Sequence, residues 1–328
     1  MNKNSLEDFR AEAKALKVPA EMVTKAEALM EKGLPYIQIK DQLPSRKGYM
    51  EATLHIKRSQ QSDYYFFNKY ELAYSKAKPL EEGKNYMVIS TSEDGKKQFK
   101  NFKSPIEAIE NFQKRDGNAE LAIGKSIKDY LTVGTMKAGT VDYVSKDFQT
   151  TYYSDPIKNT VYVNKGVGFN LKQGANMLQG GSAYRDDLVS RVGKQYEAWN
   201  TYVFDKPRDN YGNLQIKQYS EGYGFNLQNE LQGYKIKELD MPEKLAGIIS
   251  DMKDGERPIV TVVNNNDEEF KMAIKAMPRY GNINFYHLNG QAEKREQFQK
   301  ENKSELAQEN TFSRKLKQQK SENQGLTM

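Results

Sequence analysis

Runs of β-branched and aromatic residues, separated by turn-forming residues, constrain the fold of this chain more than any other feature. Short strands of this kind, joined by tight turns, favour antiparallel pairing. We therefore expect the chain to form antiparallel sheets. The runs are PYIQIK (35–40), YMEATLHIK (49–57), DYYFFNKYELAYS (63–75), NYMVIST (85–91), TVYVNKG (160–166), QYEAWNTYVF (195–204) and NLQIKQYS (213–220), followed by segments at 258–264, 268–276 and 282–288.

Helix signals lie before and between these runs. Proline suits the first helical position, and apolar residues at helical spacing follow Pro19, namely Met22, Ala26, Leu29 and Met30. The segment SPIE (104–107) combines a capping serine with a proline and a glutamate three residues on, which is typical of a helix start. A longer helix is predicted from Pro242 to Lys253.

Together these elements predict an α+β fold of two antiparallel-sheet domains with helices on one face. We expect an N-terminal domain at 1–117, a linker with short strands at 118–159, a C-terminal domain at 160–290 and a polar tail at 291–328, either helical or disordered. The two domains share a motif order. EALMEKGLPYIQIKDQ (27–42) and ISDMKDGERPIVTVVNN (249–265) each precede two further strand runs, which indicates either an internal duplication or a chance alignment of amphipathic segments.

The chain contains no cysteine and only two histidines, His55 and His287. The absence of cysteine excludes disulfides, thiolate zinc sites, iron–sulfur clusters and cysteine nucleophiles. With two histidines, a histidine-rich metal site is excluded as well. We expect no cofactor, no metal site and no catalytic residues, and therefore a protein that is not an enzyme. The alternative that is hardest to exclude is a nuclease that binds Mg²⁺ through scattered carboxylates.

Two nearly identical hexapeptides, GVGFNL (166–171) and GYGFNL (222–227), resemble phosphate-binding loops. A dinucleotide fingerprint needs a third glycine, but Leu171 and Leu227 occupy that position. Asn170 and Asn226 are instead suited to cap the helix that follows each copy. LAIGKS (121–126) also fails as a phosphate loop, because Ala119 stands where its pattern requires glycine.

The segment HIKRSQQSDYYFFNKY (55–70) interleaves cations with aromatic residues. Proteins that bind single-stranded nucleic acid use this combination, with cations for phosphates and exposed rings for bases. Because alternate residues of a strand face opposite sides, one of the pairs Tyr64/Phe66 and Tyr65/Phe67 is expected in the core, and Phe66 and Phe67 are expected mostly to pack. The candidate nucleic-acid-binding residues are Lys57, Arg58, Tyr64, Tyr65, Lys69, Arg279 and Tyr280, helped by the tail residues Arg314, Lys315, Lys317 and Lys320.

The net charge is +6, from 50 basic and 44 acidic residues that are mostly interspersed. Interspersed charge is typical of a solvated surface and favours a protein partner slightly over DNA or RNA. The sequence has no apolar run long enough to span a membrane, and its first residues lack the apolar core of a signal peptide. We therefore expect a cytoplasmic protein without membrane contact.

Four segments carry a resemblance to a known group. In their order along the chain, these segments are similar to uncharacterised proteins of Bacteroidetes. Those proteins carry domains of unknown function and are encoded on conjugative transposons and other mobile elements. The resemblance covers roughly residues 25–290, and it implies a cytoplasmic accessory role near DNA-processing and transfer proteins. The segments are KRSQQSDYYFFNKYELAYSK (57–76), VYVNKGVGFNLKQGANMLQGG (161–181), WNTYVFDKPRDNYGNLQIKQYSEGYGFNLQNEL (199–231) and MPRYGNINFYHLNG (277–290).

The residues and the resemblance together predict a non-catalytic binding or adaptor protein of a mobile genetic element. Its partner is expected to be another protein, from the element, a phage or the host. The alternative is an accessory protein that binds single-stranded DNA or RNA through the basic and aromatic residues named above.

Overall fold

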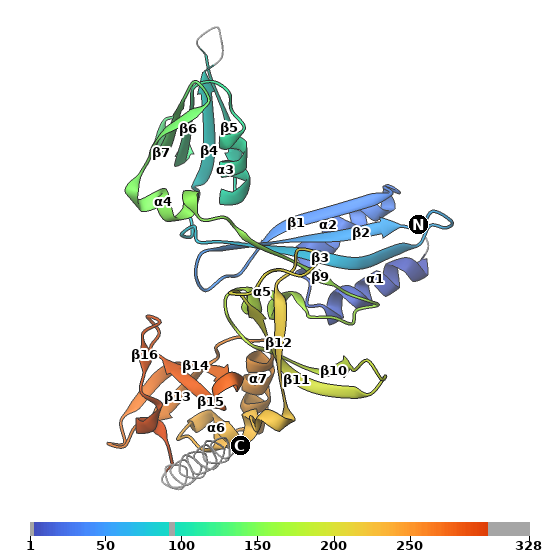
Figure 1. The fold of residues 1–328 in the computed structure, drawn as a ribbon, viewed down its shortest axis with the longest axis vertical. Helices are drawn as coiled ribbons and strands as arrows, with labels where there is room; N and C mark the ends of the chain where they lie inside the picture. The colour runs from blue at the N-terminus through green and yellow to red at the C-terminus, as the bar shows by residue number, and fades with distance from the viewer. Residues whose placement is uncertain (1–2, 92–95, 301–328) are drawn as a thin grey trace, which may run out of the picture. The chain divides into compact units, whose positions relative to one another are not determined.

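The computed structural model describes residues 3–91 and 96–300 (Figure 1). Within these residues the chain has an α+β fold with antiparallel sheets, which confirms the predicted class. It divides into two compact units. The first unit comprises the residues up to Gln179 together with Phe204–Gln215, and the second unit comprises Gly180–Val203 and the residues from Ile216 onward.

The first sheet lies in the first unit and has the strand order β1-β2-β3-β9. Its strands are β1 (Tyr36–Leu43), β2 (Tyr49–Arg58), β3 (Tyr65–Ser75) and β9 (Ile157–Tyr162). Three helices lie against it: α1 (Lys3–Ala15) against β3, α2 (Ala20–Glu31) against β1, and α5 (Leu171–Leu178) against β3 and β9. We call the face opposite these helices the open face.

Alternation along the strands produces the two faces of the first sheet. Ile37 and Ile39 of β1 are buried towards the helices, whereas Tyr36 and Gln38 between them are exposed. The ring of Phe9 in α1 packs edge-on against Phe67 of β3, with centroids 6.2 Å apart. On α2 the predicted apolar positions Met22, Ala26 and Met30 are buried, and Leu29 is half-buried.

The second sheet also belongs to the first unit and has the order β5-β4-β6-β7-β8. Helices α3 (Pro105–Gln113) and α4 (Lys146–Tyr153) pack on one face of it, over a core that includes Tyr86, Phe112 and Phe148. Ser104 caps α3 as predicted, since its side chain accepts a hydrogen bond from Glu107 N. The strands are β4 (Asn85–Thr91), β5 (Lys97–Phe102), β6 (Ala119–Ser126), β7 (Asp129–Lys137) and β8 (Thr140–Val144).

Residues 118–159 differ from the linker that we predicted. They supply three of the five strands of the second sheet, helix α4 and the start of β9. β6 pairs with β4, so that Val88 lies opposite Leu121. Because β4 and β6 are far apart in the sequence, their pairing cannot be recognised from the residues of 118–159 alone. The Gly, Lys and Asp residues of this segment are typical of a loop. The boundary between the two units follows Gln179 instead.

The second unit contains two sheets, with orders β10-β11-β12 and β13-β14-β15-β16. Trp199 is 3% exposed and belongs to the core of this unit. The strands are β10 (Ala183–Val189), β11 (Gln195–Val203), β12 (Gln215–Ser220), β13 (Ile259–Val263), β14 (Glu269–Met277), β15 (Asn282–Tyr286) and β16 (Ala292–Glu293), and the helices are α6 (Leu227–Gln232) and α7 (Pro242–Lys253). Short 3₁₀ helices cover Glu221–Tyr223, Lys237–Asp240, Pro278–Tyr280 and Arg295–Phe298.

The motif order shared by the two domains has a structural counterpart. Helix α2 is followed by β1, β2 and β3, which pair in sequence order, and α7 is followed by β13, β14 and β15, which pair in the same way. Each unit therefore contains one helix followed by a three-stranded antiparallel meander.

Both hexapeptides are junctions that lead into helices, as predicted. Asn170 caps α5 by accepting from Gln173 N at 2.9 Å, and the Gln173 side chain accepts from Asn170 N at 3.1 Å. Asn226 caps α6 by accepting from Asn229 N at 3.0 Å. The glycine that follows the first copy lets α5 approach β3 closely, because a Cβ at Gly174 would lie 2.8 Å from Leu72 Cδ1.

Candidate nucleic-acid interface

The open face of the first sheet displays aromatic and basic side chains at one end. Tyr36 lies opposite Lys57, and Lys57 lies opposite Phe66, so that the three residues form a row across β1, β2 and β3. Directly opposed side chains in a sheet have Cβ atoms about 5 Å apart. Tyr36 is 49% exposed and Phe66 is 46% exposed. We call these three residues the aromatic row.

The next row on the open face contains Gln38, His55, Lys69 and Tyr162, which lie opposite one another in that order. Tyr162 of β9 is 59% exposed. The register between β2 and β3 shifts between His55 and Ile56, which leaves Asn68 as an extra residue on β3. Because of this bulge, Phe66 and Lys69 face the same side although three positions separate them.

A polar network underlies these rings. The hydroxyl of Tyr36 is hydrogen-bonded to His55 Nδ1. His55 Nε2 lies 3.2 Å from Glu71 Oε1, an ion-pair distance without hydrogen-bond geometry. Lys69 donates to the same oxygen at 2.9 Å. Burial lowers the pKa of His55. Burial alone would raise the pKa of Glu71, but the hydrogen bond and charge of Lys69, together with the neighbouring His55, outweigh it and lower the pKa.

The two lysines of these rows differ in their charge balance. Lys69 is paired with Glu71, and the hydrogen bond to that carboxylate raises the pKa of Lys69. Lys57 is exposed, and within the described residues it has no ion-pair partner. Lys57 is therefore the cation of the open face that is free to pair with an external anion.

The structure separates the predicted site residues into distinct surroundings. Lys57 and Lys69 lie on the open face. Arg58 instead pairs with Asp63 in the β2–β3 loop and donates to Gly33 O at 3.2 Å. The hydroxyl of Tyr64 donates to Asp8 Oδ2 of α1 at 2.5 Å. These partners hold Arg58 at the end of β2 and Tyr64 beside α1.

The prediction of Tyr65 as a nucleic-acid-binding residue is wrong, because its ring is buried and cannot stack on a base. Tyr65 is 4% exposed, and its hydroxyl donates to Leu34 O at 2.9 Å. The alternation of β3 turns Tyr65 and Phe67 towards the helices, which leaves Phe66 outside. The pair Tyr65/Phe67 therefore lies in the core, which confirms that one of the two pairs is buried. Phe66 lies at the surface, so the prediction that it mostly packs in the core is wrong.

The remaining predicted site residues lie elsewhere. Arg279 and Tyr280 belong to the second unit, where the guanidinium lies 5.4 Å from the centre of the ring and Tyr280 is 58% exposed. The basic tail residues Arg314, Lys315, Lys317 and Lys320 lie outside the described residues.

Sequence reasoning missed Tyr36 and Tyr162. The alternation of Tyr36, Gln38 and Lys40 with buried isoleucines was a usable signal for Tyr36. For Tyr162 there was no such signal, because its position depends on the pairing of β9 with β3, which the intervening second sheet separates in sequence.

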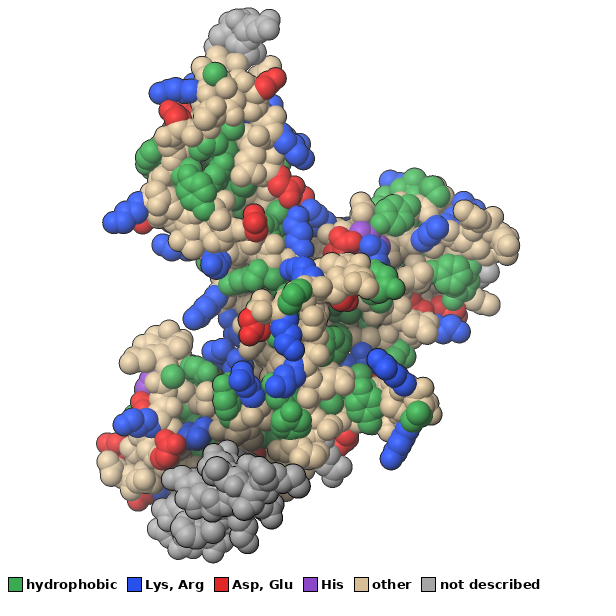
Figure 2. Space-filling view, in the orientation of Figure 1, with side chains coloured by type: hydrophobic (Ala, Val, Ile, Leu, Met, Phe, Trp, Pro, Cys, Tyr) green, Lys and Arg blue, Asp and Glu red, His purple; other side chains and the backbone are tan. Residues whose placement is uncertain are grey.

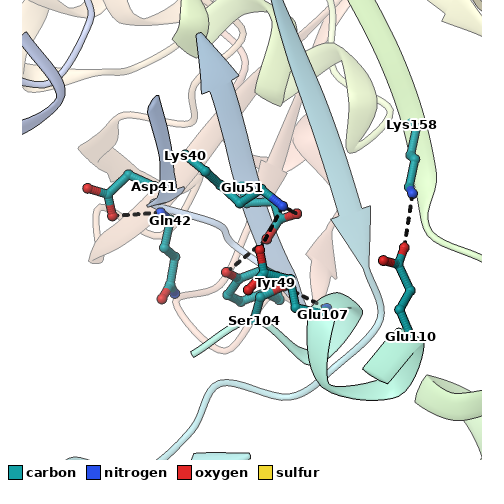
Figure 3. Close-up of polar contacts among 9 residues, drawn as sticks. All are labelled: Lys40, Asp41, Gln42, Tyr49, Glu51, Ser104, Glu107, Glu110 and Lys158. Carbon is teal, nitrogen blue, oxygen red and sulfur yellow. Dashed lines mark hydrogen bonds and ion pairs between the residues drawn. The ribbon is translucent and has the colours of Figure 1, made fainter. Parts of the chain in front are cut away.

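The other end of the open face is a polar pocket of about 430 Å³. Its floor contains Glu51, which is only 4% exposed. Lys40 Nζ lies 3.5 Å from Glu51 and 2.8 Å from Glu107, and the hydroxyl of Tyr49 donates to Glu51 at 3.2 Å (Figure 3). Burial, with Glu51 nearby, raises the pKa of Tyr49. The buried carboxylate is therefore balanced by a cation and a hydroxyl.

A loop of the first unit forms one wall of this pocket. Asp209 Oδ1 accepts from the backbone N of Tyr211 and of Asn213, which closes the loop on itself. The loop is bound to β9, because Asn213 Oδ1 accepts from Thr160 N at 2.9 Å and Arg208 donates to Lys158 O at 2.7 Å. Tyr211 in this loop is 80% exposed.

On the face that Figure 2 shows, basic and acidic side chains are interspersed. The described residues contain no group of three or more His, Asp or Glu side chains placed to hold a metal ion. Nor does the described part of the chain contain a helix with the length and apolar character needed to cross a membrane. Comparison with protein-family models, with curated proteins and with solved structures gave no match for this chain.

Proposed function

We propose that this chain is a non-catalytic binding protein whose open face binds single-stranded DNA or RNA. The observation that carries the proposal is the aromatic row, in which the exposed cation Lys57 stands between the half-exposed rings of Tyr36 and Phe66. Every base has a π-face, so exposed rings bind single strands with little sequence preference, and lysine binds the phosphates. A sheet with helices on one face and rings on the other is one way in which proteins hold unpaired bases.

The proposed setting is the cytoplasm, in the service of a mobile genetic element. The resemblance to proteins of conjugative transposons supports this setting, because it implies an accessory role near DNA-processing and transfer proteins.

A protein partner is the second candidate, and the second sheet favours it. Phe99, Ile89, Glu120, Thr135 and Tyr143 lie opposite one another across all five strands, on the face away from α3. Phe99 is 47% exposed and Tyr143 is 51% exposed. Figure 2 shows apolar side chains gathered over this sheet. Aromatic residues are enriched in protein interfaces.

A fluorescence titration with labelled single- and double-stranded oligonucleotides at two salt concentrations tests the first candidate. We expect single strands to bind more tightly and affinity to fall with salt, because phosphate contacts release counterions. The slope of log affinity against log salt concentration should become shallower by about 0.7 in Lys57→Gln, which is the value of one phosphate contact on a single strand. The matched control is Lys128→Gln, which removes an exposed lysine from the β6–β7 turn.

Failure to bind any oligonucleotide at low salt would refute this function. Co-purification from the native host would then test the protein partner, with Phe99→Ala and Tyr143→Ala expected to abolish the association.

A further inference from the structure

The polar pocket continues the open face beyond the aromatic row. Thr53, Glu71 and Thr160 form the row that follows His55, Lys69 and Tyr162 along the strands, and all three line the pocket. Same-face residues of a strand are about 6.7 Å apart, so the pocket begins about 13 Å from the aromatic row. A strand of nucleic acid that stacks on the row reaches the pocket within a few nucleotides.

Building on the proposed function, we propose that this pocket holds one base of the bound strand and selects bases that carry an exocyclic amino group. Cytosine, adenine and guanine have such a group, and thymine and uracil do not. The volume of about 430 Å³ lies within the range of small-molecule sites.

Glu71 supplies the selectivity. Its Oε1 contacts Lys69 and His55, whereas its Oε2 has no hydrogen-bond partner within the described part of the chain. The side chain is 45% exposed and lines the pocket. An ionised carboxylate only accepts hydrogen bonds, and carboxylates accept from the amino group of cytosine. Thymine and uracil instead present two carbonyl oxygens, which the carboxylate repels, beside a single N–H.

The loop that carries Arg208 and Tyr211 supplies the rim. Its hydrogen bonds to Lys158, Asn159 and Thr160 fix it against β9, so the exposed ring of Tyr211 is held at the mouth of the pocket. Such a ring can stack on a base of any kind. Arg208 also lines the pocket and supplies positive charge for the phosphate of the same nucleotide, whereas the ammonium of Lys158 is already paired with Glu110 at 3.3 Å.

The experiment compares labelled dC12 with dT12, and rC12 with rU12, by fluorescence anisotropy at one low salt concentration. We expect wild-type protein to bind the cytosine oligonucleotides about tenfold more tightly, the size of one good contact to a base edge. In Glu71→Gln the difference should fall to within about twofold, because an amide can donate to the thymine oxygen as well as accept. Glu82→Gln, an exposed loop residue outside the pocket, should keep the full difference.

Equal binding of dC12 and dT12 by the wild type would overturn the inference, and so would an undiminished difference in a folded Glu71→Gln variant. Tyr211→Ala provides a second variant that leaves the fold intact, because the side chain is 80% exposed. It should weaken binding of all oligonucleotides at least about fivefold, and unchanged affinity would overturn the pocket as a base site. Absence of binding to every oligonucleotide would refute the proposed function itself, which distinguishes the two failures.

Discussion

The hydroxyl of Tyr36 and the Nδ1 atom of His55 are hydrogen-bonded across β1 and β2. The other ring nitrogen, Nε2, faces the carboxylate of Glu71 at 3.2 Å. A proton on Nε2 suits that carboxylate, so Nδ1 is the acceptor and Tyr36 is the donor. One neutral histidine thereby connects an exposed ring of the aromatic row to the charged residues beneath it.

The first prediction concerns the pH dependence of stability. Burial lowers the pKa of folded His55 below its ordinary value of 6.5, so the unfolded chain takes up this proton more readily. The contribution of neutral His55 is therefore present above about pH 6.5 and is lost as the pH falls through the folded-state pKa. We expect the free energy of unfolding of the first unit to drop between pH 7 and pH 5, with His55 contributing part of that drop.

His55→Gln should remove this part of the drop, measured by urea denaturation at each pH. His287→Gln is the matched control, because it removes the other histidine, in the second unit. An identical pH profile for wild type and His55→Gln would contradict the prediction.

The second prediction distinguishes the contribution of the aromatic rings of the open face to binding from the contribution of the Tyr36 hydroxyl. Tyr36→Ala, Phe66→Ala and Tyr162→Ala should each weaken binding of a single-stranded oligonucleotide by about 1–3 kcal/mol, the usual contribution of one stacked base. Tyr36→Phe should bind as the wild type does, because it keeps the ring. Fluorescence anisotropy measures each affinity.

Tyr153→Ala is the control for this series, since Tyr153 is 68% exposed on α4, outside the open face. It should leave affinity within about twofold, well under the effect of one stacked base. Full affinity in both Tyr36→Ala and Phe66→Ala would exclude the aromatic row as the binding surface.

The third prediction compares two helical glycines that differ in how much space surrounds them. Gly174→Ala in α5 should destabilise the first unit by about 1–3 kcal/mol, because the new Cβ would lie 2.8 Å from Leu72 Cδ1 and 2.9 Å from the Tyr70 hydroxyl. Gly247→Ala in α7 meets no atom within 4 Å. It should stabilise the second unit by up to about 1 kcal/mol, the gain in helix propensity. Urea denaturation and calorimetry each measure the free energy of unfolding of both variants. An unchanged free energy of unfolding in Gly174→Ala would contradict the close packing of α5 on β3.

The elements that depend only on neighbouring residues could be predicted from the amino-acid sequence. The caps formed by Ser104, Asn170 and Asn226 were predictable because each side chain bonds a backbone N–H three residues further on. The buried stripe of α2 was predictable in the same way, since helical spacing alone brings Met22 and Met30 to one face. The α+β class followed from adding such local signals along the chain.

The set of residues that shares the open face could not be predicted in this way, because it depends on how distant strands pair. The bulge at Asn68 turns Phe66 and Lys69 to the same side, contrary to simple alternation. The pairing of β9 with β3 adds Tyr162 to the open face, and the pairing of β6 with β4 makes a sheet of the segment that looked like a linker. The physical reason is the range of the interactions. A helix cap or stripe is completed within a few residues, whereas a strand's neighbour and register are set by hydrogen bonds and burial between segments far apart in the chain.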